Sequence, residues 1–289
     1  MYGVKSFYLK FMKKLGNTNN ILVKGFITLF FPNKFFTAFY RYAIDLKKIS
    51  NTATISFDCD HLADVEALPE LLQILHSYDI KVSFACVGRF IEKYPRLHTK
   101  IIENGHEIIN HTYLHPSRFD RLSITEQKYE ITQCHNVCQE LLNYEPIGFR
   151  IPHFAKSHNA SIYEILSELG YVYSSSILAV KVARVWPYSV NGILEFPIVT
   201  CPKHPFQAFD TYHAFRSHIT SHKNEETFYE VLKELIEFCE CEGLYLNIYF
   251  DPQDVMRFDN FERFLGCLKE RMHLRTFNDM IDVSRWESL

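Results

Sequence analysis

The chain has 289 residues, of which 47% are hydrophobic and 22% are charged. This length suits one large α/β domain with a sizeable core, and the composition excludes a disordered or fibrous protein. The net charge of −3 gives no indication of nucleic acid or another polyanion as a partner.

Residues 1–50 differ from the rest in charge. They hold nine basic residues against one acidic residue, so they carry +8 and the remainder carries −11. The same segment is rich in Phe and Tyr, and basic residues interleaved with bulky apolar ones favour contact with an anionic membrane surface. Lys24 and Pro32 interrupt the apolar stretch, which argues against a transmembrane span, and no signal-peptide pattern is present. The alternative is a helical extension packed on the next domain with a solvated basic face.

Residues 51–289 are expected to form one catalytic domain of alternating strands and helices. Strands are expected at Ala53–Asp58, Lys81–Val87, Glu107–Asn110, Ile147–Arg150, Tyr171–Ile177, Ile193–Val199, Leu244–Phe250 and Leu274–Phe277. Helices are expected at Glu66–His76, 88–104, Ser123–Asn143, His158–Leu169, Glu225–Cys241 and Asn260–Arg271. Residues 179–222 contain four prolines and are expected to be largely a loop over the site.

Cysteine usage indicates a reducing compartment. The eight cysteines are scattered and form no Cys-x-x-Cys pair. Cys134 and Cys138 are one helical turn apart and are expected to pack as small apolar groups. Free thiols in the cytoplasm explain this pattern better than disulfides.

Two aspartates end the first predicted strand. Asp58 and Asp60 lie on the same side of the strand, because successive side chains alternate between its two faces. Two carboxylates side by side require a cation or an arginine to compensate their charge.

Two histidines, His111 and His115, follow the third predicted strand with three residues between them. Two imidazoles and one carboxylate make a three-ligand metal site with positions left for water and substrate. Asp60 or Asp58 then supplies the carboxylate ligand, and the other is free to act as a base on a bound water.

The next predicted strand ends in Phe149-Arg150-Ile151-Pro152, after the Phe57-Asp58-Cys59-Asp60 and His111-x-x-x-His115-Pro116 motifs. In this order and spacing the three motifs resemble those of the polysaccharide deacetylases (carbohydrate esterase family 4). The resemblance covers about residues 52–283. It implies an irregular β/α barrel with the site at the carboxyl ends of the strands.

The resemblance also implies roles for individual residues. Asp60, His111 and His115 would bind one divalent metal, with zinc as the expected ion. Asp58 would be the general base, and Arg150 would hold it in place. The backbone N–H of His153 would stabilise the oxyanion.

The chain departs from the family pattern in its second half. Asp251, in Tyr249-Phe250-Asp251-Pro252, stands where relatives have the histidine that acts as general acid. Ser174 stands where many relatives have an aspartate, and the position of His153 more often holds an aromatic residue. The metal half of the site therefore matches the family, and the acid half is altered.

Three interpretations of the altered half remain open. Asp251 is itself the acid, with a pKa raised by burial or by a neighbouring carboxylate. Alternatively, Asp251 orients a histidine that has taken over the task, with His213 preferred over His153. In the third interpretation the chain binds a sugar without hydrolysing it.

The function expected from the sequence is metal-dependent removal of an N-acyl group, acetyl or formyl, from an amino sugar. The alternative is a non-catalytic sugar-binding relative. The basic, aromatic residues 1–50 favour a lipid-linked or cytoplasmic glycan precursor as the substrate. We therefore expect a cytoplasmic protein, peripheral on the inner face of the membrane.

Overall fold

The computed structural model describes residues 2–43, 51–154, 160–218 and 222–286. The strands are β1 (Thr52–Cys59), β2 (Ser83–Cys86), β3 (Glu107–Asn110), β4 (Gly148–Phe149), β5 (Tyr173–Ser174), β6 (Tyr188–Val190), β7 (Ile193–Glu195), β8 (Leu246–Phe250) and β9 (His273–Leu274). The boundary expected near residue 50 lies outside the described residues.

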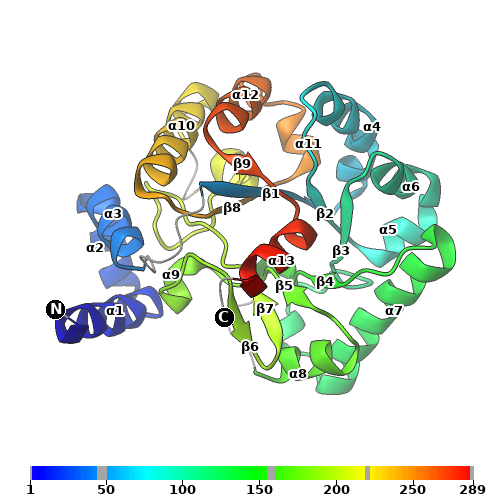
Figure 1. The fold of residues 1–289 in the computed structure, drawn as a ribbon, viewed down its shortest axis with the longest axis horizontal. Coiled ribbons are helices and arrows are strands. Elements are labelled where there is room, and N and C mark those ends of the chain that lie inside the picture. The colour runs from blue at the N-terminus through cyan, green and yellow to red at the C-terminus, as the bar shows by residue number, and fades with distance from the viewer. Residues whose placement is uncertain (1, 44–50, 155–159, 219–221, 287–289) are drawn as a thin grey trace.

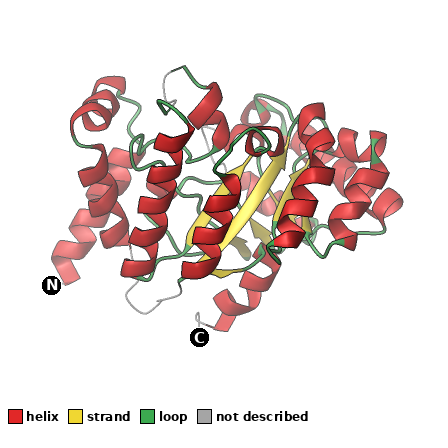
Figure 2. Ribbon diagram, turned by 90° about the horizontal axis from the view of Figure 1, so that it is seen from above, coloured by secondary structure: helices red, strands yellow, loops and turns green. Residues whose placement is uncertain are grey.

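Helices surround the strands in both views (Figures 1 and 2). They are α1 (Tyr2–Gly16), α2 (Ile21–Phe30), α3 (Pro32–Ala43), α4 (Leu62–Ser77), α5 (Gly88–Lys93), α6 (Pro95–Glu103), α7 (Ile124–Leu142), α8 (Ala160–Glu168), α9 (Ala179–Val182), α10 (Glu225–Glu242), α11 (Pro252–Val255), α12 (Phe261–Arg271) and α13 (Phe277–Trp286). Short helical turns occur at η1 (Phe119–Arg121), η2 (Pro152–Phe154) and η3 (Tyr212–Arg216).

The strands form one curled sheet in the order β6-β7-β5-β4-β3-β2-β1-β8, with β9 pairing with the start of β1. All neighbouring strands are parallel except β6 and β7. The edge strand β8 is tied to the segment after β7, where the N–H of Val199 donates to the Asn247 carbonyl at 2.9 Å. This irregular closure confirms the expected irregular β/α barrel.

The central strands agree with the sequence-based prediction, and the differences lie in one helix, in the last strand and within residues 179–222. The predicted strand Leu274–Phe277 is wrong beyond Leu274, because Thr276 begins the hydrogen bonding of α13 through its carbonyl to Met280. The expected helix over 88–104 is broken at Pro95, which starts a second helix. Within residues 179–222, α9, β6 and η3 stand where loop was expected.

Buried apolar side chains form the core, and the cysteines are free thiols. The largest cluster of buried side chains extends from Met12 and α3 across β1 and β2 to α12. All eight cysteines are unpaired, and Cys134 and Cys138 pack within this cluster, as predicted.

The N-terminal helices pack beside the barrel through α3, at the left in Figure 1. The ring of Phe36 packs against that of Phe238 in α10 at 6.0 Å between centroids, and the hydroxyl of Tyr40 accepts from the N–H of Thr200 at 3.0 Å. Arg41 pairs with Glu242 at 2.9 Å. Among the described residues, no single helix is long and apolar enough to cross a membrane, whereas 21–30 and 32–41, bent by 98°, pass that test as a pair.

Candidate metal centre and active site

The metal ligands expected from the sequence converge at the carboxyl ends of β1 and β3. Asp60 follows β1 directly, and His111 follows β3. The Asp60 Oδ1 lies 3.1 Å from His111 Nε2 and 3.3 Å from His115 Nε2. The three atoms all lie within 4.8 Å of one another, close enough to share one ion.

The two histidines are brought together by a loop, since residues 111–115 are not helical. Thr112 and His115 both have left-handed backbone conformations, with φ of 66° and 57°. Glu130 of α7 stabilises this shape, because its Oε2 accepts hydrogen bonds from the N–H groups of Tyr113 at 3.0 Å and Leu114 at 2.8 Å. The sequence analysis did not identify Glu130, whose place within a helical pattern gives no sign of this contact.

The donor atoms fit a divalent cation. Within the described part of the chain, Asp60 Oδ1, His111 Nε2 and His115 Nε2 are buried and make no hydrogen bond. His111 Nδ1 lies 2.8 Å from the carbonyl oxygen of Arg150, which accepts only from a protonated nitrogen, so Nε2 is the nitrogen that faces Asp60. Burial lowers the pKa of His111, but the hydrogen bond and charge of Asp60 raise it above its ordinary value, and a bound cation would replace the proton on Nε2. Burial and the nearby His111 lower the pKa of His115 to about 3, which keeps this imidazole neutral. Neutral imidazoles and a carboxylate are what zinc-class ions bind.

Asp58 is paired with Arg150 beside the metal ligands. Arg150 Nη1 donates to Asp58 Oδ1 at 2.5 Å, and the other aspartate oxygen lies 4.0 Å from His111 Nε2. Arg150 is fully buried and is oriented by Ser175, whose carbonyl accepts from Nε at 3.0 Å and whose Oγ accepts from Nη2 at 3.1 Å. Burial raises the pKa of Asp58, and the charges of Arg150 and His111 act in the opposite direction. The pair leaves one carboxylate oxygen free to face the metal ligands.

These groups open into a cavity of about 390 Å³. Its lining joins residues from the ends of β1 and β8, from η2 and from η3: Asp58, Asp60, His61, His153, Phe154, Tyr212, His213, Arg216, Tyr249 and Asp251. All three candidates for the general acid therefore line the same cavity as the candidate base.

His213 is held by a carboxylate that the sequence analysis missed. Its Nδ1 lies 2.6 Å from Asp210 Oδ2, and its N–H donates to Asp210 Oδ1 at 2.8 Å. Tyr249 donates its hydroxyl proton to the same Oδ2 at 2.8 Å. Burial alone lowers the pKa of His213, but the hydrogen bond and charge of Asp210 raise it above its ordinary value. The Asp-x-x-His spacing is the sequence signal that would have indicated this pair.

Asp251 has a different partner from the one expected. In the described part of the chain it pairs with Arg216 of η3 rather than with a histidine, and Arg216 also contacts Asp254 at 3.0 Å. Burial and the charges of Asp60 and Asp64 raise the pKa of Asp251, while Arg216 opposes them. The expectation that Asp251 orients a histidine is therefore wrong, because its carboxylate is paired with the guanidinium of Arg216.

His153 lies at the edge of the metal ligands. Its ring centroid is 4.6 Å from that of His115, and its backbone is left-handed with φ of 56°. Burial lowers the pKa of His153, so its imidazole is neutral at pH 7 and a poor proton donor. The role of its backbone N–H stays a prediction.

A model of the polysaccharide deacetylase family matches residues 46–174. A peptidoglycan-N-acetylglucosamine deacetylase of Bacillus cereus is 29% identical over 113 residues, which are 39% of this chain and 41% of that protein. A chitooligosaccharide deacetylase of Azorhizobium caulinodans is 27% identical over 117 residues, 40% of this chain and 53% of that protein. The chain thus spans about half or less of the length of these curated relatives.

The fold extends beyond these matched stretches. The structure is similar to that of a Mycobacterium smegmatis protein assigned as a polysaccharide deacetylase, with a TM-score of 0.68 and 18% identity. The superposition covers 85% of this chain and 93% of the other. At this identity the likeness shows a shared fold.

We expect His111→Ala to lose one equivalent of divalent metal relative to the unaltered protein, because two of three ligands rarely hold such an ion at a three-ligand site. Elemental analysis after dialysis measures it. His76→Ala, at an exposed position on α4, is the matched control and should keep its full metal content. Full metal content in His111→Ala would contradict the assignment of the ligands.

Proposed function

Because the chain belongs to the polysaccharide deacetylase family, we propose that it is a metal-dependent hydrolase that removes an N-acetyl group from an amino sugar. The observation that carries this proposal is the position of the Asp58–Arg150 pair beside three buried donor atoms that have no hydrogen-bond partner in the described residues. Asp60, His111 and His115 would hold the ion, and we propose zinc. When bound, it would supply Lewis acidity for activating water and polarising the acyl oxygen.

Asp58 is the proposed general base. Its free oxygen faces the metal ligands, and the hydrogen bond from Arg150 fixes the other oxygen. Asp58 would take a proton from the attacking water as the oxygen of that water approaches the acyl carbon. Arg150 acts as a positioning residue, since it contacts the base and is fully buried.

His213 is the proposed general acid. The departing amine must receive a proton, because an unprotonated amine leaves poorly. Asp210 raises the pKa of His213 and so favours the protonated imidazole near neutral pH. Burial raises the pKa of Asp251 well above its ordinary value, so Asp251 stays the competing candidate, although Arg216 already occupies its carboxylate. A sugar-binding protein without activity would need no such titratable group in the cavity, which favours hydrolysis over that alternative.

We also propose that the protein acts at the inner face of a membrane, in the cytoplasm, on a lipid-linked or cytoplasmic glycan precursor. Helix α2 supports this, because it has no buried residue and exposes a run of large apolar side chains. Ile21 is 82% exposed and Leu29 is 77% exposed. Free exposure of such a surface is unfavourable in water, and the interface of a bilayer would cover it.

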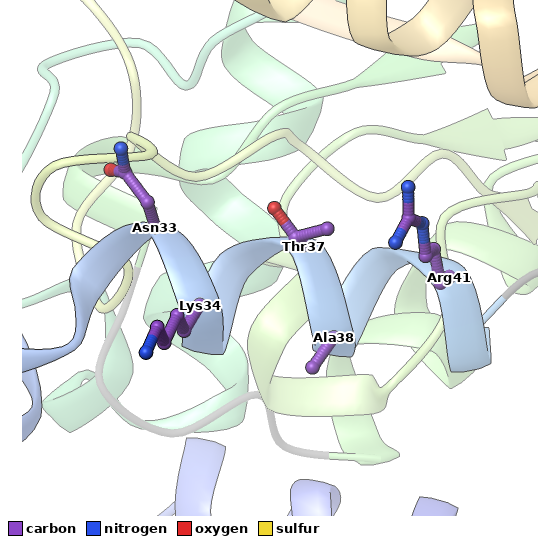
Figure 3. A pocket seen from close by; sticks show the side chains of 5 residues that line it. All are labelled: Asn33, Lys34, Thr37, Ala38 and Arg41. Carbon is purple, nitrogen blue, oxygen red and sulfur yellow. The ribbon is translucent and has the colours of Figure 1, made fainter.

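Basic groups lie next to this apolar helix. A hollow of about 530 Å³ follows α3 and is lined by Asn33, Lys34, Thr37, Ala38 and Arg41, as Figure 3 shows. Lys34 gives it a positive charge that suits an anionic head group, whereas the charge of Arg41 is compensated by Glu242. The apolar and basic surfaces together support peripheral binding to acidic lipid.

Asp58→Asn should retain the metal and reduce kcat on an N-acetylated glucosamine oligomer by about 10² or more, as loss of a general base usually does. The amide preserves the shape of the side chain and cannot accept the proton. Parallel measurement of metal content and deacetylation rate tests this. Activity near that of the unaltered protein would remove Asp58 from this role.

His213→Ala should abolish the fall in kcat at alkaline pH and lower kcat by about 10²–10⁴. In the unaltered protein kcat falls at alkaline pH because the general acid loses its proton. The pKa of His213 is raised, so this fall should occur above the ordinary histidine pKa of about 6.5. Asp210→Asn should move the alkaline fall of kcat to lower pH, because the charge that raises the pKa of His213 is removed. An unchanged pH profile in both variants would transfer the role to Asp251 or His153.

Ile21→Ser with Leu29→Ser should reduce co-sedimentation with vesicles of acidic phospholipid several-fold at low salt, because these side chains would enter the bilayer. Ile124→Ser, at an apolar residue of α7 that is 62% exposed, is the matched control. Added salt should weaken binding of the unaltered protein by screening. Equal binding by all three proteins would refute membrane contact through α2.

A further inference from the structure

A second cluster of metal-binding side chains lies outside the cavity. Cys201 and His204 belong to the segment after β7, and His222 precedes α10. The Cys201 sulfur is 3.5 Å from His204 Nδ1 and 3.6 Å from His222 Nε2. All three donor atoms lie within 4.8 Å of one another.

These spacings match the edges of a tetrahedral zinc site. With Zn–S near ~2.3 Å and Zn–N near ~2.0 Å, tetrahedral angles place sulfur and nitrogen about 3.6 Å apart. A thiol can donate its proton to one imidazole and accept from the N–H of the other, so two hydrogen bonds would give the same two distances. What favours a metal is that three donor atoms of metal-binding type converge on one point.

The protonation states also suit a cation. Burial lowers the pKa of His204 and lowers that of His222 to about 4, so both rings are neutral ligands. Burial raises the pKa of the Cys201 thiol to about 12, although the backbone N–H groups of Lys203 and His204 act on the sulfur in the opposite direction. A buried thiol with N–H groups directed at it becomes a thiolate when a metal replaces its proton.

We propose that Cys201, His204 and His222 bind a second divalent metal of the zinc class, separate from the ion at Asp60. The fourth position of the tetrahedron is left to water or a small anion. In sequence, Cys201 and His204 precede the segment that carries Asp210 and His213, and His222 follows it. His222 already contacts that segment, since its N–H donates to the Ala214 carbonyl at 3.0 Å.

The same site connects to the N-terminal helices. Thr200, next to Cys201, donates to Tyr40 of α3 at 3.0 Å. Phe206 packs on Phe35 at 5.2 Å between centroids. The metal would therefore fix one segment between α3 on one side and the candidate acid on the other, and its role would be to order this segment.

Cobalt replacement tests the proposal on the unaltered protein. Apo protein reconstituted with Co²⁺ should develop a near-ultraviolet thiolate-to-metal absorption band, which a site made of Asp60 and two histidines lacks because it has no sulfur ligand. X-ray absorption of the zinc-loaded protein should show sulfur at about 2.3 Å. Absence of both signals would overturn the proposal.

Variants assign the signal to this cluster. Cys201→Ser should lose the band and one of two metal equivalents, while His111→Ala should keep the band and lose the other equivalent. Cys239→Ser, at a buried thiol of α10, is the matched control and should keep both. A band that persists in a folded Cys201→Ser protein, or a total of one equivalent in the unaltered protein, would refute the second site. Neither readout depends on deacetylase activity.

Discussion

The buried guanidinium of Arg150 is the interaction on which the rest of the site depends. A charge in the centre of a barrel is costly unless it is paired and hydrogen-bonded. Here Asp58 supplies the opposite charge, Ser175 accepts two further bonds, and the rings of Tyr249, Phe154 and Phe277 lie within 6 Å of the guanidinium. The carbonyl of the same residue fixes the tautomer of His111. One residue thus orders the candidate base and one metal ligand together.

The sequence predicted the half of the site that is built from short, ordered motifs. Asp58, Asp60, His111, His115 and Arg150 each follow or end a regular strand, and the carboxyl ends of parallel strands meet at one edge of a sheet. Alternation along β1 was enough to place both aspartates on one side. The central strands were predictable for the same reason, since their apolar runs are long and end at clear breaks.

The acid half depends on contacts between residues far apart in sequence. Arg216 reaches Asp251 across 35 positions, and Tyr249 reaches Asp210 across 39. Periodicity contains no information on such pairs, so Asp251 was assigned the wrong partner. The irregular segment that brings them together is shaped by packing against α3 and by turns, which explains why its helices and strand were expected to be loop. The shape of the histidine loop likewise rests on Glu130, 15 residues after His115.

Tyr249 contacts both halves of the site. Its hydroxyl bonds to Asp210, and its ring lies 5.4 Å from the Arg150 guanidinium. Substitutions in the two halves are therefore expected to show epistasis, because a shift of this ring alters the surroundings of both proton-transfer groups. A histidine at 251 would leave Arg216 facing Asp254 without Asp251, so an exchange at this position requires a compensating change at Arg216.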